Sequence, residues 1–200
     1  MNRGCIYYIM GKSSSGKDTI YRSLKEHYGS ALASIVPYTT RPSRSGEQNG
    51  REYRFVSEEE YLAMKERGGI LEERSYQTVA GLWRYFTALD EQLERVKNGE
   101  SALMVGTLES YASLKEKLGE DMVIPLYIEL EDGLRLARAL ERERSQEKPA
   151  YREMCRRYLA DCEDFSEERI RAAGIVKRFD NTDLEHCLGR CMEEIDARQE

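Results

Sequence analysis

The sequence has no long apolar run, and none of its hydrophobic stretches approaches the roughly 20 residues that a membrane-spanning helix needs. It also has no internal repeat and no low-complexity tract, and nothing at its start resembles a signal peptide. Its five cysteines lack the dense spacing of a disulfide framework. These absences argue against a membrane protein and a disulfide-stapled fold, and they predict a cytoplasmic protein with no membrane partner.

Histidine is scarce, and the two residues, His27 and His186, lie outside every motif described below, so neither is assigned a catalytic role. His186 with Cys187 and Cys191 can be imagined as a set of metal ligands. A four-residue spacing of cysteines in an amphipathic pattern is more typical of one buried helix face. We therefore expect these cysteines to belong to the core.

The composition is that of a globular domain. Hydrophobic residues make up 40% of the 200 residues and charged residues 34%, which is enough for one packed core with a well-solvated surface. The net charge is −6, and acids and bases are interleaved along the chain. This pattern argues against nucleic acid as a partner, and we infer no obligate protein partner either. Any phosphate site must be a local concentration of arginine and lysine.

Short apolar runs alternate with helix-like patterns along most of the chain. The expected strand and helix pairs are 5–10 with 18–24, 102–105 with 108–118, 122–130 with 133–143, and 174–176 with a closing helix that ends near 197. Such alternation predicts an α/β fold, with a mostly parallel sheet covered by helices on both faces.

Two segments interrupt this alternation in what we expect to be one domain. Residues 38–87 are rich in Gly, Arg, Tyr and Glu, and they carry a helix start at Ser57, which Glu60 can complete as a capping box. We interpret them as an inserted subdomain. Residues 138–157 are rich in arginine, too polar to pack and interrupted by a proline, which suggests either a mobile lid or a solvated helix pair. The core would then be 1–37, 88–137 and 158–200.

A phosphate-binding loop is the strongest local signal. The run Gly11-Lys-Ser-Ser-Ser-Gly16-Lys17 lies between an apolar run and a helical pattern, where its backbone N–H groups can surround a phosphate. Lys17 would meet the β and γ phosphates of a donor nucleotide. A plain Gly/Ser turn is the alternative. The residues expected to bind the donor are Gly11, Ser13, Ser14, Ser15, Gly16, Lys17, Asp18 and Thr19.

One position departs from the loop pattern. Asp18 follows Lys17, where a Ser or Thr hydroxyl normally ligates Mg²⁺. A carboxylate is itself a favourable ligand for Mg²⁺, so Asp18 can bind the ion directly or through water, or it can simply stabilise the start of the helix. We take Asp18 as the candidate metal ligand.

A second concentration of cationic groups follows in residues 39–57. Arg41 and Arg44 lie with Tyr53 in a segment broken by glycines and a proline, and arginine forks suit the bidentate capture of phosphate. Two phosphate sites in one chain would hold a donor nucleotide and a phosphorylated acceptor. A solvated basic loop is the alternative.

This segment resembles the signature of the guanylate kinase family, and the resemblance covers nearly the whole chain. The signature Thr-Thr-Arg-Pro-x-Arg-x-Gly-Glu begins here at Thr39, and Gly, Tyr, Phe-Val-Ser and an acidic-aromatic helix follow in order. The resemblance implies that the acceptor phosphate is held by Arg41, Arg44, Tyr53 and Tyr85. It implies that Glu72 accepts the guanine N–H groups, that Thr87 supplies a hydroxyl, and that Arg157 and a lid partner, Arg142 or Arg144, act with Lys17 in catalysis.

The chain departs from the family where the base is read. Pro37 stands where the family has a serine, and Phe86 replaces a glycine between Tyr85 and Thr87. The family's Asp-x-Asp falls on Val105-Gly106-Thr107, so both carboxylates are absent. These changes weaken guanine discrimination and the support of the metal, because specificity depends on leaving the wrong base unpaired.

The resemblance implies ATP-dependent phosphoryl transfer to a nucleoside monophosphate, GMP or dGMP, with Mg²⁺ as cofactor. Three alternatives stay open. A P-loop kinase for another acceptor, such as ribose 1,5-bisphosphate, can also have a Gly-Lys-Asp loop, and Pro37 and Thr107 keep it open, whereas Glu72 and the Gly-Glu…Gly…Tyr53 run favour a nucleotide acceptor. A non-catalytic peptide-binding module is disfavoured by the intact loop. A GTPase-like switch lacks support because no Asn-Lys-x-Asp sequence is present.

Overall fold

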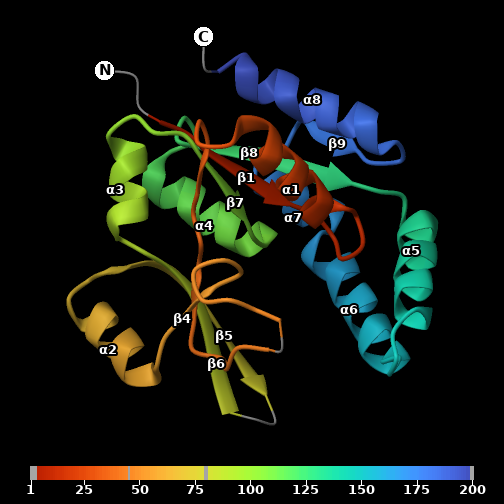
Figure 1. The fold of residues 1–200 in the computed structure, drawn as a ribbon, viewed down its shortest axis with the longest axis horizontal. Helices are drawn as coiled ribbons and strands as arrows, with labels where there is room; N and C mark the ends of the chain where they lie inside the picture. The colour runs from red at the N-terminus through yellow and green to blue at the C-terminus, as the bar shows by residue number, and fades with distance from the viewer. Residues whose placement is uncertain (1–3, 45, 79–80, 199–200) are drawn as a thin grey trace.

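A five-stranded parallel sheet forms the centre of the computed structural model, which describes residues 4–44, 46–78 and 81–198. The strands lie in the order β2-β7-β1-β8-β9 (Figure 1). Their bounds are β1 Ile6–Met10, β2 Ala33–Ser34, β7 Ala102–Val105, β8 Val123–Glu129 and β9 Arg178–Asp180. All five residues of β1 are buried, because helices cover the sheet on both sides.

The helices divide between the two faces according to the alternation of side chains along β1. Ile6 and Tyr8 pack with apolar residues of three helices, and Tyr7 and Ile9 pack with apolar residues of two others. The first group is α3 Glu91–Lys97, α4 Leu108–Leu118 and α7 Glu167–Ala172, and the second is α1 Lys17–Tyr28 and α8 Leu184–Asp196. The predicted α/β fold is confirmed.

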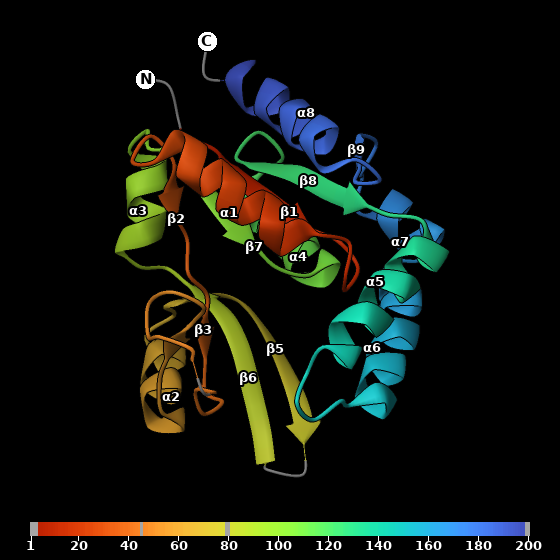
Figure 2. The same ribbon diagram turned by 45° about the vertical axis from the view of Figure 1, so that its right-hand side comes forward.

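A second sheet projects from the first. Its four strands lie in the order β4-β3-β6-β5, and Figure 2 shows the β5–β6 hairpin extending away from the parallel sheet. The bounds are β3 Tyr38–Thr39, β4 Arg54–Phe55, β5 Ile70–Thr78 and β6 Gly81–Ala88. Beside it lies α2, Glu58–Glu66, whose predicted capping box between Ser57 and Glu60 is present. The boundaries 38–87 of the insert stay a prediction.

The arginine-rich segment belongs to a pair of contacting helices, α5 Asp132–Arg144 and α6 Tyr151–Asp164. The expectation that this segment is too polar to pack is wrong in part. Ala139, Glu143 and Met154 are buried, and Glu143 accepts a hydrogen bond of 2.5 Å from the backbone N–H of Ala150. A buried carboxylate therefore closes the turn between the helices. The lid boundaries 138–157 stay a prediction.

The last strand lies four residues later than the sequence predicts. Residues 174–176 are apolar, but they form no strand, and Val176 is 92% exposed. Ile175 is buried without belonging to a strand, and Phe179 in β9 enters the core where it pairs with Ile128 of β8. An apolar run of three residues was too short to show which of its side chains are buried.

The C-terminal cysteines are core residues, as expected. Cys187 and Cys191 are buried on the face of α8 that packs against the parallel sheet. Within the described ranges, no group of three or more His, Cys, Asp or Glu residues is placed to hold a metal ion. Among the same residues, no helix has both the length and the apolar character that crossing a membrane requires.

Candidate active site

The loop from Gly11 to Lys17 joins the carboxyl end of β1 to the first residue of α1. Gly16 has φ 92°, a conformation that favours glycine, and Ser14 also has a positive φ of 66°. A Cβ atom at Gly11 would overlap the carbonyl oxygen of Ile128 on the neighbouring strand β8. The two glycines are therefore required by the path of the chain as well as by the motif.

Two serine hydroxyls of this loop are orphaned. The Oγ atoms of Ser14 and Ser15 are buried, and within the described part of the chain neither has a hydrogen-bond partner. An unpartnered buried hydroxyl costs about 1–3 kcal/mol, so such groups usually have a partner that the protein alone does not supply. The loop stands at the N-terminus of α1, where anions are favoured. These features fit a bound phosphate.

Lys17 and Asp18 begin α1 side by side. The Nζ atom of Lys17 lies 3.5 Å from Oδ2 of Asp18, whose side chain is 76% exposed. Magnesium at nucleotide sites is commonly held by one or two carboxylates together with the phosphates of the substrate. The solvent-facing carboxylate of Asp18 fits that mode.

Distant residues that carry no recognisable motif also contact the loop. Asn181 is buried, and its Nδ2 donates to the carbonyl oxygen of Ser15 over 2.7 Å. Asp161 of α6 accepts a hydrogen bond of 2.8 Å from the backbone N–H of Ser13. The first contact supports the loop, and the second places a carboxylate on an N–H group of the phosphate site.

Arg41 is held by a bidentate ion pair. Its Nη1 and Nη2 donate to the two carboxylate oxygens of Glu47 over 2.7 and 2.6 Å, and the Arg41 side chain is only 3% exposed. The guanidinium also lies 5.1 Å from the ring centre of Tyr53 and 5.4 Å from that of Phe55. The hydrogen bonds from Arg41, together with one from the backbone N–H of Arg44, lower the pKa of Glu47 to about 2. Glu47 therefore fixes both arginine positions.

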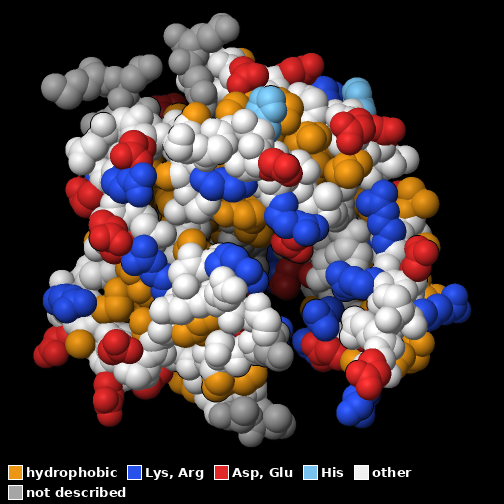
Figure 3. Space-filling view, in the orientation of Figure 1, with side chains coloured by type: hydrophobic (Ala, Val, Ile, Leu, Met, Phe, Trp, Pro, Cys, Tyr) orange, Lys and Arg blue, Asp and Glu red, His pale blue; other side chains and the backbone are white. Residues whose placement is uncertain are grey.

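A cavity of about 1010 Å³ opens between the hairpin and α6. Figure 3 shows a hollow between these two parts of the molecule, bordered by Lys and Arg side chains. The cavity brings together residues of both segments that interrupt the α/β alternation. Its lining includes Arg44, Tyr53, Arg74, Tyr76, Tyr85, Thr107, Arg156 and Arg157. The rings of Tyr53 and Tyr85 meet edge to face, 5.6 Å between centroids.

Glu72 lies at an irregularity in the hairpin, two residues before Arg74, which lines this cavity. The pairing of β5 with β6 shifts between Ile70 and Glu72, which brings Glu72 opposite Thr87. The Thr87 hydroxyl donates to Oε1 of Glu72 over 2.7 Å, and both residues are buried. The predicted base-binding pair is thus in mutual contact.

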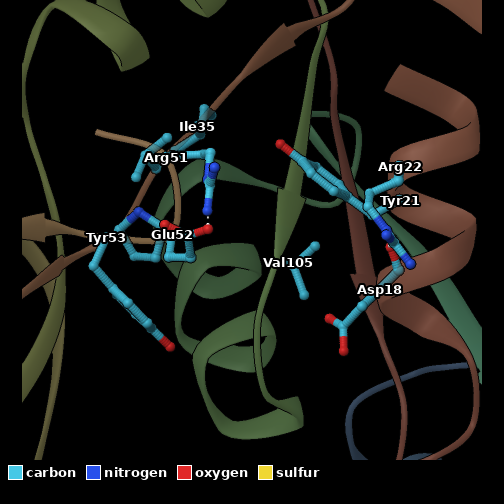
Figure 4. A pocket seen from close by; sticks show the side chains of 10 residues that line it. Asp18, Tyr21, Arg22, Ile35, Arg51, Glu52, Tyr53 and Val105 are labelled. Atoms are coloured by element: carbon cyan, nitrogen blue, oxygen red, sulfur yellow. Dashed lines mark hydrogen bonds and ion pairs between the residues drawn. The ribbon is translucent and has the colours of Figure 1, made fainter. Parts of the chain in front are cut away.

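A second cavity, of about 640 Å³, adjoins the first and shares Pro37, Tyr53 and Val105 with it. Figure 4 shows Asp18 on α1 at one side of this cavity, Tyr53 on the opposite side, and Val105 at the end of β7 between them. The start of α1 therefore faces Tyr53 across this cavity.

Arg157 lines two of the cavities. It lines the large cavity with Arg44 and Tyr53, and it also lines a small cavity with Ser13 and Ser14 of the loop. Arg142 lines the small cavity as well. The other candidate for the lid partner, Arg144, is exposed near the end of α5.

A family model described as guanylate kinase matches residues 3–164 of the chain. The chain belongs to the guanylate kinase family. A guanylate kinase of Fusobacterium nucleatum is 32% identical over 124 residues, which cover 62% of this chain and 64% of that protein. A guanylate kinase of Thermotoga maritima is 30% identical over 146 residues, 70% of this chain and 67% of that protein. The first match thus spans slightly less than two thirds of the relative's length.

The fold agrees with this membership. The crystal structure of a guanylate kinase from Anaplasma phagocytophilum superposes with a TM-score of 0.64. The superposition covers 99% of this chain and 88% of the other, at 22% sequence identity. At that level of identity the likeness concerns the arrangement of helices and strands.

This guanylate kinase family member fills the place of its missing carboxylates with other contacts. Thr107 caps α4 by accepting from the backbone N–H of Ser110, and its Oγ1 also accepts a hydrogen bond of 2.6 Å from Nη1 of Arg74. The Nε atom of Arg74 lies 3.4 Å from Oε2 of Glu72. Burial alone would lower the pKa of Arg74, but the charge of Glu72 raises it, so Arg74 stays protonated. Arg74 belongs to no motif, so it is not among the site residues predicted from the sequence.

Proposed function

We propose that this protein transfers the γ-phosphoryl group of ATP to a nucleoside monophosphate, GMP or dGMP, forming GDP or dGDP. The observation that carries the proposal is the position of Arg157, which lines one cavity with the phosphate-loop serines and another with Arg44 and Tyr53. A cation between two phosphate sites is what direct transfer requires, because negative charge is spread over the group in transit. The names of the relatives support the same activity.

In this proposal the two substrates are held from opposite sides of the cavity. The phosphate loop and Lys17 hold the donor phosphates, and the cluster of Arg41, Arg44, Tyr53 and Tyr85 holds the acceptor phosphate. Arg157 and Arg142 surround the transferring group. The transfer is in line and needs no covalent intermediate, so the protein supplies positioning and charge. Asp18 would hold Mg²⁺, which neutralises charge on the donor phosphates.

The purine of the acceptor is proposed to lie over Glu72. This carboxylate can accept from the N1–H and 2-amino groups of guanine, and its bond from Thr87 fixes its orientation. A nucleotide acceptor fits these contacts better than a sugar phosphate does, because a sugar phosphate offers no planar edge with two adjacent N–H donors. The acceptor preference should therefore follow the base.

An acceptor panel tests the activity. ADP formation from ATP is measured with GMP, dGMP, AMP, CMP, UMP and ribose 1,5-bisphosphate at equal concentration. We expect GMP or dGMP to stimulate it most. The absence of stimulation by either guanine nucleotide would refute the proposed acceptor, and stimulation by ribose bisphosphate alone would identify the other kinase class.

Replacement of Lys17 tests the mechanism. Lys17→Ala should lower kcat at least 100-fold, since removing one group that stabilises developing charge typically costs 10²- to 10³-fold. The control is Lys97→Ala at the end of α3, where Lys97 makes an exposed ion pair with Glu94. Undiminished transfer by Lys17→Ala would rule out the proposed role of the loop.

A further inference from the structure

Arg74 is a largely buried cation, with a side chain that is 11% exposed. Its side chain lies on β5 next to Glu72 and lines the large cavity. Among the described residues it donates one side-chain hydrogen bond, to Thr107, and its buried Nε–H has no hydrogen-bond partner there. Leaving a buried charged donor incompletely paired costs free energy, so a purely structural role is poorly served by this residue.

Arg74, which lines the cavity, pairs with the buried carboxylate of Glu72. Glu72 is acceptor-only, and Arg74 is donor-only, with 3.4 Å between Oε2 and Nε. A ligand edge that carries an acceptor next to a donor matches this pair. Guanine has such an edge, with the 6-oxo group beside N1–H, whereas adenine has an amino group at the corresponding position.

Among the other groups that line the cavity, Tyr8 and Thr107 have hydroxyls that can donate, and both are neutral. Pro37 has no hydroxyl and no N–H, and Val105 has no polar side-chain atom. A hydrogen bond from a charged donor is stronger than one from a neutral hydroxyl. The guanidinium of Arg74 is thus the cationic donor next to Glu72.

We propose that Arg74 is a specificity-determining residue that donates a hydrogen bond to the 6-oxo group of the acceptor base, which makes the acceptors 6-oxopurine nucleoside monophosphates. This inference rests on the proposed function. Pro37, Val105 and Thr107 stand where the family has a serine and two aspartates. Arg74 would supply a contact to the base in their place. Because the donor is charged, the contact discriminates strongly against a base without a 6-oxo acceptor.

A binding cycle tests the contact without relying on turnover. Dissociation constants for GMP and 6-thio-GMP are measured by calorimetry with the unaltered protein, Arg74→Gln and Arg74→Lys. The two ligands share N1–H and the 2-amino group, but sulfur is a much weaker hydrogen-bond acceptor than oxygen. The unaltered protein should bind GMP about 10- to 100-fold more tightly than 6-thio-GMP, as expected for a hydrogen bond from a charged donor.

In Arg74→Gln the ratio of the two dissociation constants should fall to about threefold or less, because a neutral amide discriminates less between an oxygen and a sulfur acceptor atom. Arg74→Lys keeps the charge that pairs with Glu72, so it should give an intermediate ratio. It also keeps the test decisive if Arg74→Gln does not fold. The matched control is Arg84→Gln, on the paired strand β6, where the guanidinium binds Glu58 over 2.7 Å. It should keep the ratio of the unaltered protein.

The results separate the two proposals. An unaltered protein that binds and phosphorylates GMP but binds 6-thio-GMP equally well would overturn the role of Arg74 alone. The role of Arg74 would also be overturned if Arg74→Gln and Arg74→Lys both left the ratio of the two dissociation constants unchanged. A fall of this ratio in Arg84→Gln as large as the fall in Arg74→Gln would have the same meaning. An unaltered protein that neither binds GMP nor consumes ATP with it would refute the proposed function itself, and with it the class of acceptor.

Discussion

Replacing Glu47 with glutamine removes one half of the ion pair that fixes Arg41. The lowering of the Glu47 pKa from 4.5 to about 2 corresponds to about 3 kcal/mol as an upper limit. Solvent screening at a side chain that is 16% exposed reduces this to about 1–2 kcal/mol. Arg41 would be left buried without its partner, which adds to the loss. We expect Glu47→Gln to lower the free energy of unfolding by about 2–4 kcal/mol at pH 7.

The assay is urea-induced unfolding of the two proteins, with Glu94→Gln as control. Glu94 also makes an ion pair of 2.7 Å, but its side chain is 58% exposed, so its loss should cost less than about 1 kcal/mol. Steady-state kinetics with GMP provide a second readout. Because Glu47 also accepts from the backbone N–H of Arg44, the KM for GMP should rise about tenfold, the equivalent of 1.4 kcal/mol, in the Glu47 variant only.

The pH dependence gives the sign of the effect. The pKa of Glu47 is lower in the folded protein than in the unfolded chain, so its contribution is complete above about pH 4.5. It is lost as the pH falls from there toward about 2, where the carboxyl group becomes protonated in the folded protein. The difference in unfolding free energy between the unaltered protein and Glu47→Gln should therefore shrink over that interval. A difference no larger than that of Glu94→Gln at pH 7, or one that grows on acidification, would refute the reasoning.

Two further predictions concern the residues that contact the phosphate loop. Asp161→Asn should lower the KM for ATP about 3- to 10-fold, because the carboxylate that now accepts from the N–H of Ser13 would repel the donor phosphates. Kinetics at saturating GMP measure this, with the exposed Asp164→Asn as control, and a raised KM would contradict it. Asn181→Ala should cost about 1–3 kcal/mol of unfolding free energy, because the buried carbonyl of Ser15 loses its donor. Urea unfolding tests this, and a loss below about 0.5 kcal/mol would show that the contact is dispensable.

The parts of the fold that were predictable from the sequence are those with local signals. The strand at 102–105 and the helix at 108–118 have the predicted bounds, because each combines an apolar pattern with a clear end signal. The phosphate loop and the capping box at Ser57 are also short-range patterns. Each depends on a few neighbouring residues, so one sequence contains the necessary information.

The residues that the sequence did not reveal act across long separations. Asp161 meets Ser13 over 148 residues of chain, and Asn181 meets Ser15 over 166. Arg74 gains its importance from Thr107, which is 33 residues away on another element. No period or spacing records such contacts, because they arise only when the sheet and the insert are packed together. The same reason explains why the last strand was expected at 174–176.

Helix α6 connects the two halves of the site. Arg157 and Asp161 are four residues apart on it, one turn of a rigid rod. If donor phosphates displaced Asp161 from the loop, the same movement would shift Arg157 in the large cavity. Occupancy of the donor site then changes the affinity for the acceptor, and by thermodynamic reciprocity the acceptor changes the affinity for ATP by the same factor. The cooperativity between the two substrates would thus depend on the sequence of one helical turn.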